Sequence, residues 1–242
     1  MTKYGIIGNP LGHSFSRGFF TEKFTKEGID AQYLNFQIPE IAEFPKILKE
    51  NPELRGLNVT LPYKTEVIPF LDELSDEARE IGAVNVVQIR NGHLKGFNSD
   101  IIGFTRSIQP LLKPHHRKAL ILGTGGASRA IRVGLTRLGL EWKYVSRTPR
   151  EGMFTYNDLT TESLQEYEVI VNCSPVGMFP KVDECPAIPY KYLTPDNLLY
   201  DLVYNPETTL FMKKGALQGA VVKNGLEMLH LQAIASWEFW NE

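Results

Sequence analysis

The chain is poor in cysteine, lacks long apolar runs and carries no excess of charge of one sign. Its two cysteines, Cys173 and Cys185, are too few for a disulfide framework and form no Cys-x-x-Cys motif. No apolar stretch reaches the roughly 20 residues that a membrane-spanning helix needs. The start of the chain, MTKYGIIGNP, has no secretory signal pattern. The net charge of −2, without a basic cluster, argues against nucleic acid as a partner. We therefore expect a cytoplasmic protein that binds neither membranes nor nucleic acid.

The first hundred residues alternate short strand-like runs with helix-length segments, which is typical of α/β architecture. A chain of 242 residues with 43% hydrophobic content can hold one large domain or two small ones. The expected strands are 4–8, 32–37, 56–60, 83–89 and 93–97, and the last two flank an Asn-Gly turn. The expected helices are 16–28, 40–50 and 76–81.

The second half shows the same alternation after a polar break at residues 113–117. A helix over 100–112 precedes this break, and we place the hinge between two domains around it. The expected strands are 119–122, 142–146, 169–172, 198–202 and 220–223. Because crossover-length segments separate them, they predict a parallel sheet with right-handed connections. The chain ends in an apolar helix over 227–240.

A glycine turn lies between the strand at 119–122 and the helix that follows it. The Gly-x-Gly core suits a tight turn in which a pyrophosphate approaches the backbone, and the helix N-terminus offers free N–H groups to the anion. Ser128 stands at the third glycine position of the fingerprint. The turn predicts dinucleotide binding, with a purely structural glycine turn as the alternative. The predicted contact residues are Gly123, Thr124, Gly125, Gly126 and Ala127.

The next strand ends in a basic segment that indicates a preference for NADP. Enzymes that choose NAD usually place an acidic residue here for the ribose 2′-hydroxyl, whereas this segment has Ser146, Arg147, Thr148 and Arg150. Guanidinium groups suit a 2′-phosphate because they present charged donors in a fork. Two solvated arginines are the alternative reading, and Glu151 nearby leaves room for mixed use of NAD.

Polar residues recur at the expected strand ends of the first half. Ser14 and Ser16 follow the first strand and could cap a helix, cradle a phosphate or line a pocket. Asn85 lies inside an apolar run, where a buried amide must be hydrogen-bonded. Taken singly, Lys64 reads as a surface lysine and Asp100 as a helix cap.

In this order the motifs resemble the shikimate dehydrogenases, NADP-dependent enzymes of aromatic amino-acid biosynthesis, almost from end to end. The shared segments are His13-Ser14-x-Ser16, Asn58-Val59-Thr60-x-Pro62-x-Lys64, Gly82-Ala83-Val84-Asn85, Asn98-Ser99-Asp100, the glycine turn, Asn172-Cys173-Ser174-Pro175-x-Gly177-Met178, Asp201-Leu202-Val203-Tyr204-Asn205-Pro206 and Gly225-x-x-Met228-Leu229-x-x-Gln232.

The resemblance implies a role for each of these segments. Lys64 and Asp100 would be the catalytic pair, and Lys64 in its ammonium form could supply the proton when a ketone is reduced. Ser14 and Ser16 would hold the carboxylate of shikimate or 3-dehydroshikimate. The remaining substrate residues would be Asn58, Thr60, Asn85, Tyr204 and Gln232, with Asp100 also contacting a hydroxyl. Met178 and Gly225 would lie near the nicotinamide. Arg17 stands where the family usually has proline.

The resemblance also implies the architecture: an α/β substrate domain over 1–101 and 226–242, and a doubly wound, Rossmann-like NADP domain over 102–225. The C-terminal helix would return to the first domain, and the protein would be a monomer or homodimer. The alternatives are a quinate/shikimate dehydrogenase that uses NAD and a non-catalytic NADP(H)-binding sensor. No metal is expected, because His115 and His116 lack partnering carboxylates or cysteines.

Overall fold

The computed structural model describes residues 1–12 and 15–242, which form two compact units. Unit 1 comprises Met1–Ser99 and Gln232–Glu242, and unit 2 comprises Asp100–Leu231. The division falls at the start of the helix on which the sequence placed the hinge. Which ligand each unit binds, and hence the functional domains 1–101 with 226–242 and 102–225, stays a prediction.

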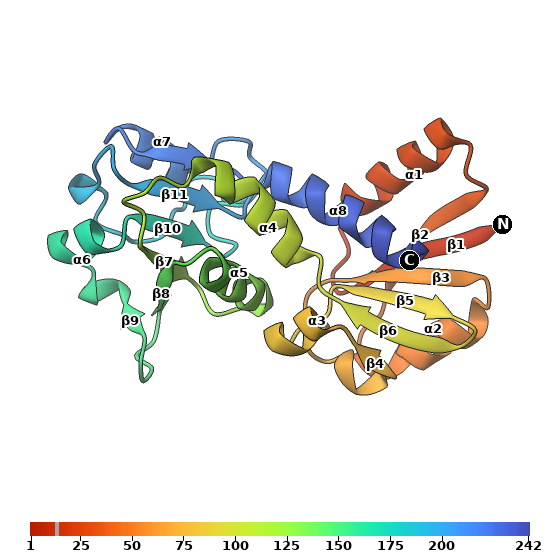
Figure 1. Cartoon of the computed structure of the whole chain (residues 1–242). Coiled ribbons are helices and arrows are strands. Elements are labelled where there is room, and N and C mark those ends of the chain that lie inside the picture. The colour runs from red at the N-terminus through yellow and green to blue at the C-terminus, as the bar shows by residue number, and fades with distance from the viewer. Residues whose placement is uncertain (13–14) are drawn as a thin grey trace. The chain divides into compact units, whose positions relative to one another are not determined.

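Unit 1 is built on a mixed sheet with the strand order β2-β1-β3-β5-β6-β4 (Figure 1). Its strands are β1 (Thr2–Gly8), β2 (Ala31–Gln37), β3 (Leu54–Val59), β4 (Glu73–Leu74), β5 (Val86–Arg90) and β6 (His93–Phe97), and its first three α-helices are α1 (Phe15–Glu27), α2 (Phe44–Glu50) and α3 (Asp76–Ile81). The strands β5 and β6 form the expected antiparallel hairpin. Its turn residues Asn91 and Gly92 have φ values of 51° and 81°, as such a turn requires.

The alternation of side chains along each strand gives this sheet two buried faces. Ile7 and Leu57 pack on one face with α2 and α3, while Ile6 packs on the other with α1 and the end of α8 (Leu226–Asn241). Trp240 of α8 donates from Nε1 to the carbonyl of Val87 at 3.1 Å. The C-terminal helix therefore returns to the first unit, as the sequence predicted.

Unit 2 is an entirely parallel sheet with the strand order β12-β11-β10-β7-β8-β9. Its strands are β7 (Lys118–Leu122), β8 (Glu141–Ser146), β9 (Phe154–Thr155), β10 (Val169–Asn172), β11 (Leu198–Asp201) and β12 (Val221–Lys223). Read from β9, this is the 3-2-1-4-5-6 order of dinucleotide-binding sheets, whose switch point lies between the first and fourth strands. Here that point lies between β7 and β10.

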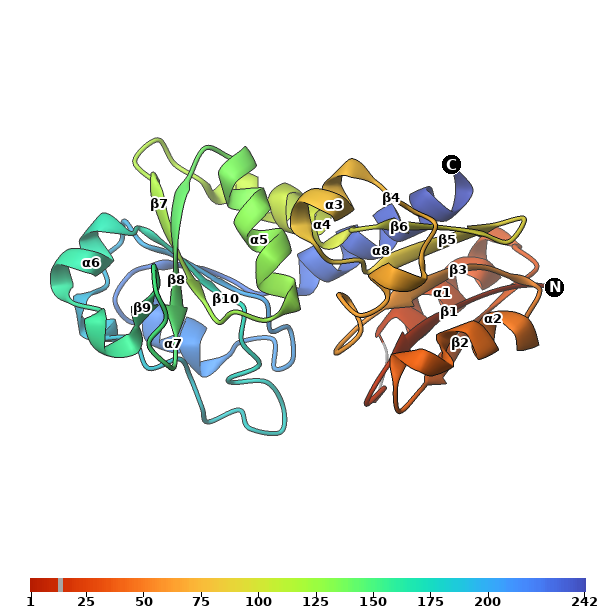
Figure 2. The same ribbon diagram turned by 90° about the horizontal axis from the view of Figure 1, so that it is seen from below.

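Helices cover both faces of the second sheet (Figure 2). The helices α4 (Asp100–Ile108) and α5 (Gly126–Arg137) pack on the face that carries Ala119 and Ile121. The helices α6 (Thr161–Glu166) and α7 (Leu210–Ala216) pack on the opposite face. A parallel sheet covered on both faces explains why its strands read as continuous apolar runs.

The differences from the expected elements are local. The helix expected over 100–112 ends at Ile108 and continues as a 3₁₀ turn over Gln109–Leu111, because Pro110 cannot donate the next helical hydrogen bond. The elements β4, β9, α6 and α7 were not expected and are all short. In the described part of the chain, no helix has the length and apolarity needed to traverse a membrane.

Candidate active site and cofactor site

Asn58, the residue before the last position of β3, is the centre of a buried hydrogen-bond network in unit 1. Its Oδ1 accepts from the Tyr33 hydroxyl at 2.7 Å, and its Nδ2 donates to the Asn85 carbonyl at 3.3 Å and to the Ser236 Oγ at 3.1 Å. Only 5% of Asn58 is exposed. The amide is thereby held in one orientation by three different elements, as buried polar groups require.

Ser99 joins the other predicted amide residues to this network. Its backbone N–H donates to Asn85 Oδ1 at 2.7 Å, and its Oγ accepts from Asn85 Nδ2 at 2.9 Å. The same Oγ lies 3.3 Å from Gln232 Oε1 and 3.1 Å from the Ser236 Oγ. The structure thus brings together Asn58, Asn85 and Gln232, whose substrate roles stay predictions.

Two members of this network, Ser99 and Ser236, are not predicted from the sequence. Ser99 belongs to the Asn-Ser-Asp motif but has no expected role of its own, and Ser236 lies outside the shared motifs. The spacing of Gln232 and Ser236, four residues apart on one helix, would have placed both on the same face. Ser236 also donates to the Gln232 carbonyl at 2.8 Å.

Ser16 reaches the network through Tyr33. Burial raises the pKa of the Tyr33 phenol, and a hydrogen bond with the Ser16 side chain works in the opposite direction. Because α1 begins at Phe15, Ser16 lies within the first turn of the helix rather than at its N-cap. Ser14, predicted to share the carboxylate with Ser16, lies outside the described residues.

The turn after β3 carries Thr60 and Lys64. The Thr60 N–H donates to the Ile7 carbonyl at 2.9 Å, and the Lys64 carbonyl accepts from the Val84 N–H at 2.7 Å. The backbone at half-buried Lys64 is therefore fixed to the residue that precedes Asn85. Asp100 is buried at the start of α4 and belongs to unit 2, so its pairing with Lys64 stays a prediction.

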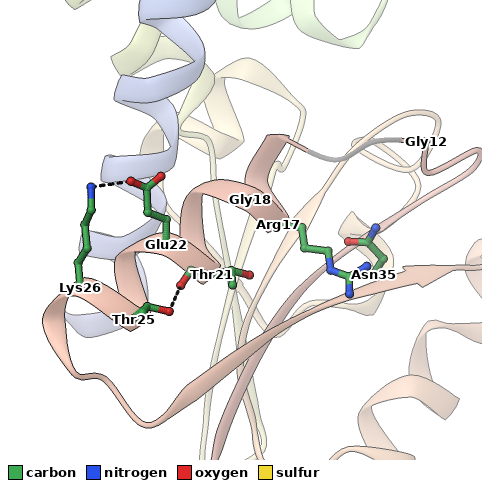
Figure 3. A pocket seen from close by; sticks show the side chains of 8 residues that line it. All are labelled: Gly12, Arg17, Gly18, Thr21, Glu22, Thr25, Lys26 and Asn35. Atoms are coloured by element: carbon green, nitrogen blue, oxygen red, sulfur yellow. Dashed lines mark hydrogen bonds and ion pairs between the residues drawn. The ribbon is translucent and has the colours of Figure 1, made fainter.

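Arg17 lines an open pocket of about 620 Å³ on the exposed side of α1. Asn35 of β2 lines the same pocket, whose rim holds the ion pair between Glu22 and Lys26 (Figure 3). None of the described residues with a predicted substrate role is part of its lining. This pocket is therefore distinct from the buried network around Asn58.

The glycine turn of unit 2 has the backbone that a bound pyrophosphate requires. Gly123 has a φ of 101°, a conformation that favours glycine. A Cβ added to Gly125 would meet nothing within 4 Å, so the backbone there borders open space. The helix α5 begins at Gly126, and its first N–H groups have no intrahelical acceptor. The predicted residues Thr124 and Ala127 belong to the same turn, which fits a dinucleotide phosphate.

The predicted 2′-phosphate residues follow β8, the strand beside β7. Because the two strands are parallel neighbours, both turns lie at the same edge of the sheet. The buried Ser146 accepts from the Thr148 N–H at 3.3 Å, while Arg147 and Thr148 are exposed. Arg147 is close enough to Tyr156 for its charge to lower the pKa of that phenol, against the larger effect of burial. A basic, accessible segment of this kind suits a phosphate.

The loop after β10 carries Met178, expected near the nicotinamide, and the loop after β11 carries Tyr204, expected at the substrate. Met178 and Tyr204 are 46% and 37% exposed, respectively, on these two loops. Gly225 donates from its N–H to the Val203 carbonyl at 3.3 Å. A Cβ at Gly225 would come within 2.2 Å of the Leu202 carbonyl oxygen, so this close approach requires glycine.

The remaining nucleophilic and metal-binding candidates have structural surroundings. Burial, and secondarily the charge of Asp201, raises the pKa of the Cys173 thiol well above its usual value. His116 accepts from the Lys113 N–H at 3.0 Å and contacts the Asp196 carbonyl at 3.1 Å. Among the residues that the structure describes, no group of three His, Cys, Asp or Glu residues is placed to hold a metal.

Comparison with known proteins decides the family. Residues 6–87 match the family described as the shikimate dehydrogenase substrate binding domain. The shikimate dehydrogenase (NADP(+)) of Desulforamulus reducens is 34% identical over 98% of this chain and 88% of its own length. The chain belongs to the shikimate dehydrogenase family.

Solved structures of this fold agree over nearly the whole chain. The shikimate 5-dehydrogenase of Thermus thermophilus, solved in complex with NADP(H) and shikimate, is 32% identical with a TM-score of 0.87, covering 99% of this chain and 93% of its own. The 5-ketofructose reductase of Gluconobacter sp. strain CHM43 is 27% identical with a TM-score of 0.84, covering 99% and 92%. The resemblance and the fold class predicted from the sequence are confirmed.

Proposed function

We propose that this chain catalyses the reversible, NADP-dependent reduction of 3-dehydroshikimate to shikimate. The observation that carries the proposal is the match to shikimate dehydrogenases along nearly the whole chain, both in sequence and in fold. The buried amide and hydroxyl network of unit 1 and the glycine turn of unit 2 supply the two kinds of binding site that this reaction needs.

The substrate is a small carboxylate with several hydroxyl groups, and unit 1 offers matching side chains. Ser14 and Ser16 bind the carboxylate through neutral hydroxyl donors. The hydroxyls of the substrate are bound by Asn58, Thr60, Asn85, Asp100 and Gln232, and Tyr204 lies near the carboxylate. Because the network fixes the amide orientations before substrate arrives, little side-chain freedom is lost on binding.

Lys64 and Asp100 serve the proton transfer. Lys64 donates a proton to the ketone oxygen during reduction, and Asp100 orients both the Lys64 ammonium and the substrate. When bound, NADPH supplies the hydride to the carbonyl carbon. Reduction is the direction that fits these residues most easily, because Lys64 then acts as a proton donor and needs no other base.

The cofactor binds to unit 2 with its pyrophosphate at Gly123–Ala127 and the N-terminus of α5. Arg147 and Thr148, held next to Ser146, bind the 2′-phosphate and favour NADP over NAD. Met178 and Gly225 contact the nicotinamide half. The protein works as a cytoplasmic monomer or homodimer on a small-molecule substrate, consistent with its two free cysteines.

The test compares the intact chain with Lys64→Ala in the reduction of NADP by shikimate. The intact chain is expected to form NADPH. In Lys64→Ala, kcat is expected to fall by a much larger factor than the factor by which KM for shikimate rises. Lys49→Ala, near the end of α2, controls for the loss of a positive charge in unit 1. Near-native kcat in Lys64→Ala would refute the catalytic assignment, and NADP binding without any turnover would favour the sensor.

A further inference from the structure

Two buried polar residues face each other at the carboxyl ends of neighbouring strands in unit 2. Asn172 ends β10 and Asp201 ends β11, and the two are partners in the register of the sheet. Both are 0% exposed. Neither has a role in the reaction described above, yet this edge of the sheet is the edge that carries the glycine turn.

Every polar atom of the Asn172 side chain is used to hold a loop or its partner. Its Oδ1 accepts from the N–H and Oγ of Ser174 at 3.1 and 2.6 Å. Its Nδ2 donates to Asp201 Oδ1 at 2.9 Å and to the Val176 carbonyl at 3.4 Å. The loop after β10 is therefore anchored at two of its first four residues by a single amide.

Asp201 holds the loop after β11 and the start of α7 in the same way. Its Oδ1 also accepts from the Val203 N–H at 3.0 Å, and its Oδ2 accepts from the Thr209 Oγ1 at 2.6 Å. Thr209 is in turn the N-cap of α7 and accepts from the Met212 N–H. Burial outweighs these three donors and raises the pKa of Asp201 to about 6.

The two anchored loops hold both residues expected at the nicotinamide, Met178 directly and Gly225 through a backbone hydrogen bond. Met178 follows Val176 on the first loop, and Tyr204 follows Val203 on the second. The loops are joined by a hydrogen bond from the Phe179 N–H to the Asn205 carbonyl at 3.0 Å. Gly225 is attached to the second loop through Val203.

We propose that Asn172 and Asp201 are positioning residues for hydride transfer: together they fix the loops after β10 and β11 and so set where the nicotinamide half of the cofactor lies. They act through Met178 and Gly225 and touch neither substrate nor cofactor themselves. This inference rests on the proposed function, because it assigns the two loops to the nicotinamide.

A buried asparagine elsewhere in unit 2 provides a matched control. Asn197 is 3% exposed and immediately precedes β11, at the opposite edge of the same sheet. Its side chain donates to the Leu164 and Glu168 carbonyls and accepts from the Thr194 N–H. Loss of either asparagine side chain thus removes a similar set of buried hydrogen bonds, but only Asn172 holds the nicotinamide loops.

The experiment compares Asn172→Ala, Asn197→Ala and Asp201→Asn with the intact chain. The readouts are kcat for shikimate, the Kd for NADP, and amide hydrogen exchange of residues 174–178 and Val203 with and without NADP. Asn172→Ala is expected to lower kcat about tenfold or more while changing the Kd by no more than about threefold, since misplacement of the nicotinamide affects the reacting geometry more than binding. It should also lose the protection that NADP gives residues 174–178. Asn197→Ala should retain both kcat and this protection.

Asp201→Asn tests the conservative replacement. An amide can accept from Asn172 and Val203 as before and donate to the Thr209 hydroxyl, which can also accept. This variant is therefore expected to keep kcat within about threefold of the intact chain. If Asn172→Ala fails to fold, Thr209→Val, which keeps its shape but removes one donor to Asp201, is expected to lower kcat and to speed exchange at Val203.

Equal losses of kcat in Asn172→Ala and Asn197→Ala would overturn the proposal. An unchanged kcat in Asn172→Ala would overturn it as well. If Asn172→Ala does not fold, an unchanged kcat in Thr209→Val has the same meaning. The exchange experiment needs no substrate, so it tests the positioning role of Asn172 and Asp201 independently of shikimate turnover. An intact chain that fails to turn over shikimate contradicts the proposed function. An intact chain in which NADP gives residues 174–178 no protection contradicts the positioning role, whatever the substrate.

Discussion

The side-chain amide of Asn58 donates to the hydroxyl of Ser236 at 3.1 Å, across 178 positions of the sequence. This contact ties the end of β3 to the last helix of the chain. Ser236 also meets the Ser99 hydroxyl, so one residue of α8 supports both halves of the amide network. The amide network of unit 1 consequently depends on the C-terminal helix as well as on its own sheet.

Ser236→Ala is expected to weaken both folding and substrate binding. It leaves a buried donor of Asn58 short of one acceptor, which costs about 1–3 kcal/mol in the free energy of unfolding, and it frees the amide to rotate. Urea unfolding and the KM for shikimate measure the two effects, and KM should rise. Ser75→Ala, which removes the N-cap of α3, should cost about 1 kcal/mol with KM unchanged. The same KM in both variants would contradict the role given to the network.

Gly125→Ala is expected to separate cofactor binding from stability. The added methyl group meets no protein atom within 4 Å, so the free energy of unfolding without NADP should be nearly unchanged. The methyl group would occupy the space proposed for the pyrophosphate, so the affinity for NADP should fall. Gly18→Ala, where a Cβ also meets open space, serves as the control for NADP titration. Unchanged NADP affinity in Gly125→Ala would exclude the turn as the phosphate site.

Arg147→Ala is expected to weaken NADP binding without weakening NAD binding. A hydrogen bond to a charged group contributes about 1.5–3 kcal/mol, which corresponds to roughly tenfold or more in affinity. NAD has no 2′-phosphate and should not sense the change. Titration of both dinucleotides measures the difference, with Arg137→Ala at the far end of α5 as the control. Equal losses for the two dinucleotides would show that Arg147 does not read the phosphate.

Asp201→Asn is expected to alter the pH dependence of stability. Burial raises the pKa of Asp201 from 3.8 to about 6, so the folded state holds this proton more tightly than the unfolded state does. The resulting stabilisation is complete below the unfolded pKa and is lost as the pH rises through about 6. A difference of about two pKa units corresponds to about 3 kcal/mol in the free energy of unfolding. Asp201→Asn has no carboxyl group at this position and therefore does not lose this stabilisation as the pH rises.

Urea unfolding at about pH 4 and about pH 7 tests this expectation. The stability of Asp201→Asn relative to the intact chain should improve toward pH 7. Two neighbouring titratable groups, Cys173 and Tyr190, both have a pKa raised by burial and by the charge of Asp201, so neither titrates in this interval. A constant difference between the variant and the intact chain would contradict the raised pKa of Asp201.

Local sequence patterns were sufficient to predict the strands and helices that have a clear apolar pattern. The strand at 169–172 has the predicted bounds, because the β-branched run Val169–Val171 favours a strand and Asn172 is typical of a strand end. The helix α7 (Leu210–Ala216) was missed, since it is short and contains Lys213, Lys214 and Gly215, which give it no clear apolar stripe. Its cap, Thr209, accepts from the Met212 N–H and donates to Asp201, a residue eight positions earlier in the chain.

The sequence predicts most residues of the candidate site but not the contacts between them. Asn85 stands out as a polar residue in an apolar run and Asn58 belongs to a motif shared with the family, yet their contact depends on the antiparallel pairing of β3 with β5. The part played by Ser236 depends on how α8 packs against that sheet. Such contacts join segments that are distant in sequence, so no local pattern contains them.

The most direct test of the proposed activity is a set of initial rates measured with NADP and with NAD. Each cofactor is combined with shikimate, with quinate and with the alcohol that reduction of 5-ketofructose produces. The account predicts that the pair of NADP and shikimate has the highest kcat/KM. Higher kcat/KM with NAD, or turnover of another substrate in place of shikimate, would contradict it.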